Sequence, residues 1–80
     1  MIELYQLEQL TAFAQYGTLS KAAEELHISQ PTLTRSMQKL ESEFNVPLFR
    51  RSKNKLEFNE NGLLAAEYAR RVLDQSQNML

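Results

Sequence analysis

Residues 19–41 have the sequence LSKAAEELHISQPTLTRSMQKLE, in which a tight turn separates two short helical patterns. Ser20 is a good N-cap for the first helix, because its hydroxyl can accept a backbone N–H, and we expect that helix to end at Leu26. Ser29 caps the second helix, and Pro31 lies in its first turn, where the missing N–H costs nothing. This pattern predicts a helix-turn-helix, a motif whose second helix can lie in the DNA major groove.

The second helix of this motif has an apolar and a polar face. Its apolar residues recur at helical spacing and are expected to face the core: Leu33, Met37, Leu40 and Phe44. On the polar face, glutamine can pair with adenine, arginine can pair with guanine, and small apolar groups can touch a thymine methyl. The candidate base-reading residues are Gln30, Pro31, Thr32, Thr34, Arg35 and Gln38. The alternative is an ordinary solvated face.

Helical patterns also flank the motif. Residues 4–16 predict a first helix, which Gly17 ends because glycine readily adopts the left-handed conformation of a helix cap. The expected core face of this helix consists of Leu7, Leu10 and either Phe13 or Ala14. Asn45 tolerates the left-handed conformation and ends the second helix of the motif. Asn59 caps a long final helix that continues to the C-terminus.

Between the last two helices, residues 48–50 and 56–58 predict two short strands of a hairpin with its tip at residues 52–55. Such a tip can place a cation in the minor groove or on flanking phosphates. The candidate wing residues are Arg50, Arg51, Lys53 and Lys55. Two alternatives remain open, a plain solvated turn and a structural ion pair between Arg51 and Glu41.

Phosphate contacts are also expected outside the wing. Backbone N–H groups and hydroxyls at helix starts can bind phosphate oxygens, as can basic side chains near them. The candidates are Ser20, Lys21, Ser29 and Lys39. Plain helix capping is the alternative for Ser20, and for Ser29 the two roles are compatible.

The distribution of charge favours an anionic partner, although the formal net charge of the chain is −1. Residues 29–55 contain six basic and two acidic residues, and the compensating acids lie in the flanks. Because charges beyond a Debye length are screened, a local basic face on a near-neutral chain can still bind phosphate.

Composition excludes several other classes of protein. The chain has no cysteine, which rules out disulfides and thiolate metal sites and is compatible with a reducing compartment. Metal-ligand spacing, a glycine-rich phosphate loop and a Ser/His/Asp set are missing, so we expect neither an enzyme nor a cofactor or metal site. Without a signal-peptide pattern or a bilayer-spanning apolar run, a cytoplasmic protein with no membrane partner is expected.

The order of these elements predicts a mainly α winged helix-turn-helix of 80 residues. Residues 1–58 form a three-helix core with a short β-hairpin wing, and residues 59–80 form a long C-terminal dimerisation or linker helix. The apolar stripe on this last helix is too long to be used up by packing on so small a domain. The candidate dimer residues are Leu64, Tyr68, Val72 and Met79.

These residues resemble the N-terminal DNA-binding domain of LysR-type transcriptional regulators over essentially the whole chain. The resemblance rests on linked motifs at matching spacings: Leu7, Phe13, Gly17, Ala22-Ala23, Leu26, Ser29-Gln30-Pro31, Thr34-Arg35, Leu40-Glu41, Pro47-Leu48-Phe49-x-Arg51 and Gly62. The chain departs from the family pattern at Asn45, Asn59, Glu60-Asn61 and the often acidic position of Arg50. None of these changes alters the expected fold, and Arg50 makes the wing more basic than usual.

The resemblance implies a double-stranded DNA operator with two-fold-related half-sites, bound by a homodimer whose last helices pair antiparallel. It also implies a separate effector-binding domain outside these 80 residues, through which alone a small-molecule effector would act. The competing hypothesis is a protein-interaction module that docks through its last helix and has a basic face unrelated to DNA.

Overall fold

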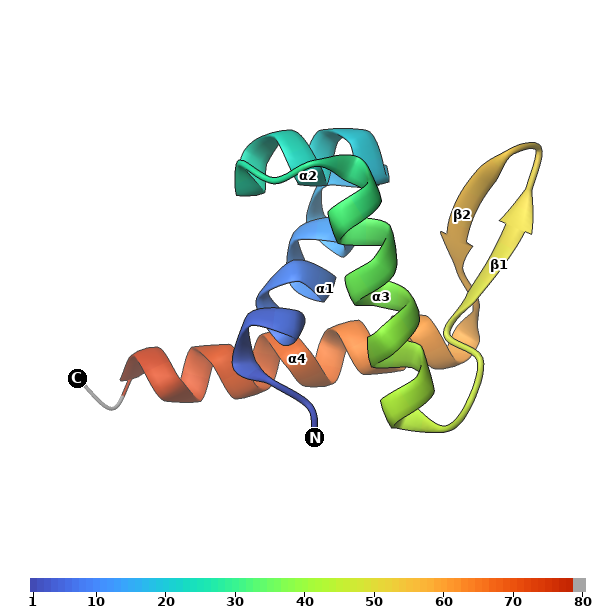
Figure 1. Ribbon diagram of the computed structural model, residues 1–80. Helices are drawn as coiled ribbons and strands as arrows, with labels where there is room; N and C mark the ends of the chain where they lie inside the picture. The colour runs from blue at the N-terminus through green and yellow to red at the C-terminus, as the bar shows by residue number, and fades with distance from the viewer. Residues whose placement is uncertain (79–80) are drawn as a thin grey trace.

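The computed structural model describes residues 1–78, so the candidate dimer residue Met79 lies outside the described part. In chain order the elements are α1 (Leu4–Tyr16), α2 (Leu19–Leu26), α3 (Gln30–Phe44), β1 (Phe49–Ser52), β2 (Lys55–Phe58) and α4 (Glu60–Asn78). The hairpin stands beside α3, and α4 is a long rod across the base of the molecule (Figure 1). This arrangement confirms the predicted mainly α winged helix-turn-helix.

The first and third helices have the predicted bounds because local signals fix their ends. Gly17 ends α1 with φ 84°, and its N–H donates to Phe13 O at 2.9 Å. The Ser29 hydroxyl caps α3 by accepting the Thr32 N–H at 3.2 Å. Asn45 ends α3 in the left-handed conformation, with φ 62°.

The predicted N-cap of α2 was wrong. Thr18, rather than Ser20, caps the helix, and its hydroxyl accepts the Lys21 N–H at 3.1 Å. Starting the helix at Leu19 places that side chain on the same face as the buried Ala22 and Ala23, three and four residues later. Ser20 is therefore the second residue of α2 and lies exposed.

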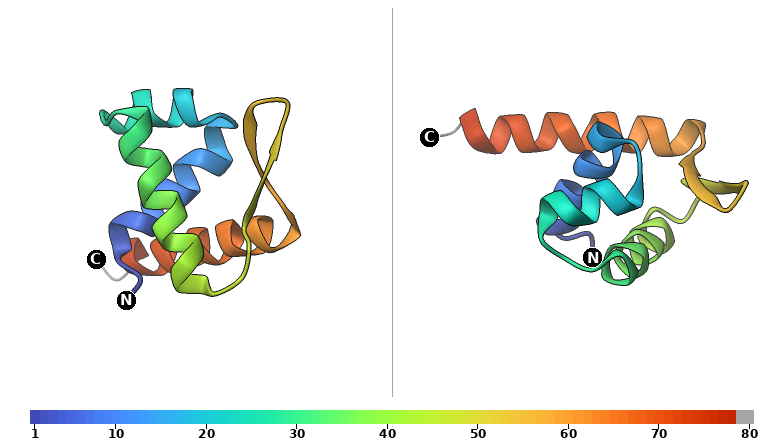
Figure 2. Two further views of the ribbon diagram at one scale, coloured as in Figure 1. Left: turned by 45° about the vertical axis from the view of Figure 1, so that its right-hand side comes forward. Right: turned by 90° about the horizontal axis from the view of Figure 1, so that it is seen from above.

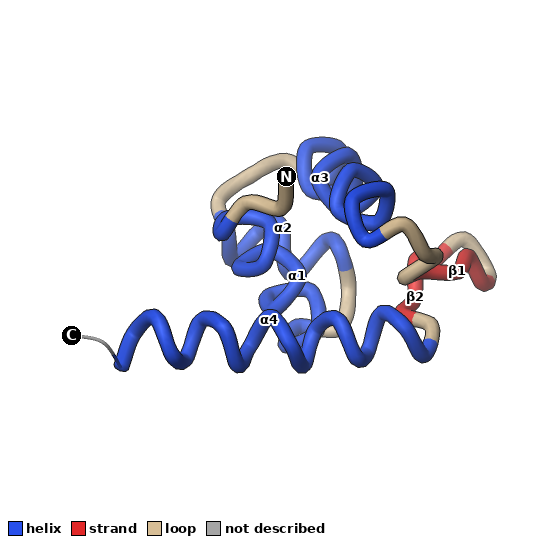
Figure 3. The backbone as a smooth tube through the Cα atoms, turned by 90° about the horizontal axis from the view of Figure 1, so that it is seen from below, coloured by secondary structure: helices blue, strands red, loops and turns tan. Residues whose placement is uncertain are grey.

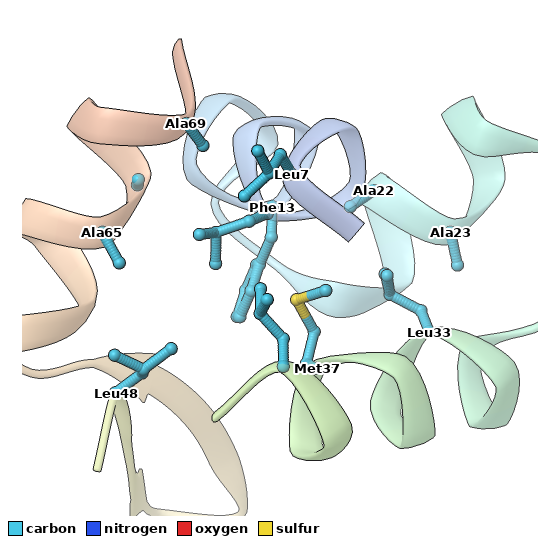
Figure 4. Packing of buried hydrophobic residues seen from close by; sticks show 12 residues of the cluster. Leu7, Phe13, Ala22, Ala23, Leu33, Met37, Leu48, Ala65 and Ala69 are labelled. Atoms are coloured by element: carbon cyan, nitrogen blue, oxygen red, sulfur yellow. The ribbon is translucent and has the colours of Figure 1, made fainter. Parts of the chain in front are cut away.

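The core lies where α1, α2, α3 and the start of α4 meet, and Figure 4 shows its side chains converging. The buried apolar residues are Leu7, Leu10, Phe13, Ala22, Ala23, Leu33, Met37, Leu40, Leu48, Ala65, Ala66 and Ala69. On α1 the core position is Phe13, whereas Ala14 is exposed. A hydrogen bond from the Ser36 hydroxyl to Gln9 Oε1 connects α3 to α1.

The hairpin is longer than predicted and its turn is shorter. Arg51 pairs with Leu56 and Ser52 pairs with Lys55, which leaves Lys53 and Asn54 as a two-residue turn. Both turn residues have positive φ, 51° and 65°, as hairpin turns that match the twist of the strands require.

An aromatic cluster joins the base of the hairpin to the core. The ring of Phe13 lies 5.9 Å from that of Phe49 and 4.8 Å from that of Phe58, centroid to centroid. Leu48, predicted to belong to the first strand, precedes it and is buried in the core.

The last helix begins as predicted, with Asn59 Oδ1 accepting the Gly62 N–H at 2.8 Å. Its small residues Ala65 and Ala69 are buried, and Val72 packs against the core. Leu64 and Tyr68 are 65% and 57% exposed. Within residues 1–78, none of the helices combines the length and the apolar character needed to cross a membrane.

Candidate nucleic-acid interface

The outer face of α3 is open to solvent. Figures 2 and 3 show α3 and α4 on opposite sides of α1, so the long helix does not cover this face. Five predicted base-reading residues are exposed: Gln30, Pro31, Thr32, Arg35 and Gln38. The sixth, Thr34, is half-buried.

A small hydrogen-bond network orders the start of this face. The Ser29 hydroxyl donates to Thr32 Oγ1 at 2.7 Å, and Arg35 Nη2 donates to the same oxygen at 3.4 Å. Because Thr32 Oγ1 accepts both bonds, the guanidinium group of Arg35 lies beside Thr32 in the first turn of α3. Arg35 is exposed, and a guanidinium group has further N–H donors that suit an acceptor such as guanine.

A cleft of about 510 Å³ separates α3 from the wing and brings together residues from three of the predicted groups. Its polar lining from the helices consists of Thr18, Ser20, Gln30 and Thr34. From the wing, Arg51, Asn54, Lys55 and Glu57 line the other side. The left view of Figure 2 shows the hairpin standing beside α3 and the corner between α1 and α2.

The wing cations differ in their partners. Arg50 Nε lies 3.4 Å from Glu57 Oε2 across the hairpin, so part of its charge is compensated. Arg51, Lys53 and Lys55 are exposed and form no ion pair with any residue in the range 1–78. The alternative pair between Arg51 and Glu41 does not form, because the Glu41 carboxylate accepts backbone N–H groups instead.

The candidate phosphate ligands near the helices are also unequal. Lys21 Nζ lies 3.6 Å from carboxylate oxygens of both Glu24 and Glu25, and these two charges raise the pKa of Lys21. Lys39 is exposed and has no acidic partner among the described residues. Lys39 is therefore the freer cation for an external phosphate.

Three polar residues of the cleft were missed by sequence reasoning: Thr18, Asn54 and Glu57, the last of which pairs with Arg50. Thr18 was overlooked because Ser20 offers the same capping chemistry two positions later. Asn54 was treated as part of a longer tip, although asparagine is a preferred residue where φ is positive. The capping hydroxyl of Thr18 and the turn preference of Asn54 can both be read from the sequence. Neither property indicates by itself that the residue borders a cleft.

An exposed second helix of a helix-turn-helix, with a basic hairpin beside it, defines a winged helix-turn-helix protein. Residues 4–63 match the family described as "Bacterial regulatory helix-turn-helix protein, lysR family". The match covers most of the chain, which therefore belongs to this family of regulators.

Individual relatives agree with this assignment. The chain is 44% identical over 70 residues to a "Probable RuBisCO transcriptional regulator" of Guillardia theta, covering 88% of this chain and 23% of that protein. It is 42% identical over 72 residues to a "Hydrogen peroxide-inducible genes activator" of Pectobacterium carotovorum subsp. carotovorum, covering 90% of this chain and 24% of that protein. The chain thus spans about a quarter of the length of these relatives.

A solved structure supports the same fold. The "Crystal structure of CbnR_DBD-DNA complex" superimposes with a TM-score of 0.89 at 38% identity, covering 98% of this chain and 90% of that one.

Proposed function

We propose that this domain binds double-stranded operator DNA in a sequence-dependent manner, as the DNA-binding head of a transcription regulator. The observation that carries the proposal is the cleft, which α3 and the wing cations border from opposite sides. In this arrangement α3 lies in the major groove, and the wing lies on the minor groove or the flanking phosphates. The similar domain whose structure is described as a DNA complex adds independent support.

Base contacts are assigned to the exposed face of α3. Arg35 is matched to guanine, and Gln30 and Gln38 are matched to adenine, because these side chains complement the major-groove edges of those bases. Pro31 and Thr32 lie at the start of the helix, where their apolar atoms can touch a thymine methyl. Thr34 is half-buried and reaches the DNA only from within the cleft.

Phosphate contacts are assigned to two groups around this face. In the wing they are made by Arg51, Lys53 and Lys55, with Arg50 contributing less because it faces Glu57. Near the helices they are made by Ser20, Lys21, Ser29 and Lys39. Contacts of this kind fix the register of the protein on the duplex and make affinity depend on salt.

The last helix is assigned to the homodimer contact, with residues 1–58 as the DNA-binding unit and residues 59–78 as the connecting helix. Leu64 and Tyr68 are exposed, as a dimer surface requires, whereas Val72 is half-buried and packs partly on its own core. A two-fold dimer matches an operator with two-fold-related half-sites. In a longer protein of this family, a separate domain would bind the effector, and the regulator would act in the cytoplasm.

The proposal is tested by selecting random duplexes with this domain and then measuring affinity against salt concentration. Enrichment of a two-fold site, with affinity falling steeply as salt rises, is the expected result. A steep salt dependence without enrichment would contradict sequence-dependent binding. If no duplex binds at low salt, the exposed Leu64 and Tyr68 favour the competing function of a protein-interaction module.

A further inference from the structure

The short segment that joins α3 to the wing is held from two sides. On the α3 side, Glu41 Oε2 accepts the Leu48 N–H at 2.7 Å and the Phe49 N–H at 3.1 Å. On the α4 side, the Asn59 N–H donates to Leu48 O at 3.0 Å. The Asn59 side-chain amide donates to Pro47 O at 3.0 Å. Consecutive peptide groups of this segment, which we call the wing root (residues 47–49), are thus fixed by both neighbouring helices.

Glu41 is an acidic residue of α3 near the proposed DNA-binding surface. It lies near the C-terminus of α3, where the helix dipole disfavours a negative charge, and its charge would repel phosphate. Two charge-assisted hydrogen bonds from a half-buried root offset this cost. These backbone contacts give the carboxylate at this position a structural role.

The wing amplifies any movement of its root. Each strand has four residues, so the tip lies about 13 Å from the root at roughly 3.4 Å per residue. A rotation of about 10° at the root would therefore move Lys53 by about 2 Å, which exceeds the tolerance of a direct hydrogen bond. The aromatic contacts of Phe49 and Phe58 bury the base of the hairpin but are less directional than the two bonds to Glu41.

We propose that Glu41 is a positioning residue that fixes the angle between the wing and α3, so that both can contact one duplex together. Glu41 does not touch the DNA itself, and its effect on binding is transmitted through Leu48 and Phe49. The inference rests on the proposed function for its consequence in DNA binding, whereas the positioning itself can be measured without DNA.

The first test measures backbone ¹⁵N relaxation and amide exchange in the free protein for Glu41→Ala, with Glu43→Ala as the matched control. Glu43 lies in the same last turns of α3, and among residues 1–78 its ion-pair partner is the Met1 amino group rather than the wing root. In Glu41→Ala we expect the order parameters of residues 50–57 to fall from about 0.85 toward 0.6, while α1 keeps its values. We also expect the Leu48 and Phe49 amides to exchange about tenfold faster. A wing as ordered as in Glu43→Ala would overturn the proposal.

A second variant covers the case in which Glu41→Ala does not fold. Glu41→Asp keeps the charge and shortens the reach by one methylene, so it should loosen the wing root in a folded protein. Glu41→Gln keeps an acceptor oxygen and should restore most of the wing order. If the aspartate variant is as rigid as the native protein, the hydrogen bonds do not position the wing.

The second test is a double-mutant cycle on DNA with Lys53→Ala. In the native background this change should weaken binding several-fold on all duplexes and lower the salt slope by about one. In the Glu41→Ala background the same change should have less than a twofold effect, because the wing is already displaced. If Lys53→Ala lowers DNA affinity equally in both backgrounds, Glu41 and Lys53 are not coupled and the proposal is overturned. No effect of Lys53→Ala in the native background would contradict the wing contact in the proposed function, while the relaxation data still test the positioning.

Discussion

Arg35 is the residue on α3 with the most specific expected role. Its guanidinium group shares Thr32 Oγ1 with the Ser29 hydroxyl, which orders a long and otherwise mobile side chain on the exposed face. Ordering before binding lowers the entropic cost of a paired contact with guanine. The same geometry can serve a phosphate, so the two roles must be separated by experiment.

Replacing Arg35 by alanine should lower affinity for the selected site by about 1–3 kcal/mol and relax the base preference at one position, since a paired contact with a base is lost. The measurement compares native and variant affinities on the selected site and on random duplexes of equal length. An equal loss on both would show that Arg35 contacts only phosphate.

Gly62 is a second residue whose role depends on one close approach. A Cβ at this position would lie 2.1 Å from Leu48 O and 2.7 Å from Phe58 Cδ1, in the place where α4 passes the wing root. Helix propensity alone favours alanine over glycine by about 1 kcal/mol. The close contact predicts that Gly62→Ala destabilises the fold, whereas helix propensity predicts that it stabilises the fold.

We expect Gly62→Ala to destabilise the fold by about 1–3 kcal/mol, because the wing root or the start of α4 must move. Thermal unfolding provides the measurement, with the exposed Glu67→Ala in the same helix as control, for which a change within about 0.5 kcal/mol is expected. A raised melting temperature in Gly62→Ala would mean that propensity outweighs the contact.

At the scale of the element, the start of α2 shows how packing selects between two equivalent caps. Thr18 and Ser20 both have a hydroxyl suited to an N-cap, and both lie before the buried Ala22 and Ala23. Only the earlier start places Leu19 inside the helix and on its buried face. The hydrophobic contact of Leu19 thus selects Thr18 as the cap.

Two similar substitutions in this region should therefore have different effects on stability. Thr18→Ala should cost about 1 kcal/mol through loss of the cap, which lowers the melting temperature of a domain of this size by roughly 4–8 °C. Ser20→Ala should stay within about 0.5 kcal/mol, because this exposed position provides no cap. Calorimetry on both variants checks the assignment, and a larger loss for Ser20→Ala would reverse it.

At the scale of the whole molecule, α4 has two faces that differ in exposure. Its alanines, with Ala65 5% and Ala69 0% exposed, allow close approach of the helix to the core. Leu64 and Tyr68 point away from that core and leave apolar surface open to solvent. This second face is the one that we propose contacts the partner subunit.

The double change Leu64→Ser and Tyr68→Ser should therefore weaken the dimer while the monomer remains folded, because both side chains are exposed in the single chain. Sedimentation should show dissociation at concentrations where the native protein is dimeric. Affinity should fall at least tenfold for a duplex with two half-sites and stay unchanged for one half-site. An equal loss on both duplexes would argue against a dimer role for this face.

The amino-acid sequence by itself determined the order of elements and most of their ends. Gly17, Ser29 and Asn45 end or begin helices through conformational preferences and hydrogen bonds that span only a few residues. The helical spacing of apolar residues likewise identified six of the twelve buried apolar residues in the described part of the chain, including Leu33, which is fully buried. Signals of such short range are visible in the sequence because every group they need is local.

The tertiary structure alone decided which of several chemically equivalent groups are used and what surrounds them. It gave the α2 cap to Thr18, joined Arg50 to Glu57, and directed Glu41 to the wing root instead of to Arg51. These choices depend on which surfaces the packed helices bring within hydrogen-bond distance. Contacts between residues distant in the chain, such as Ser36 with Gln9, leave no periodic trace in the sequence, since their geometry exists only after the core has formed.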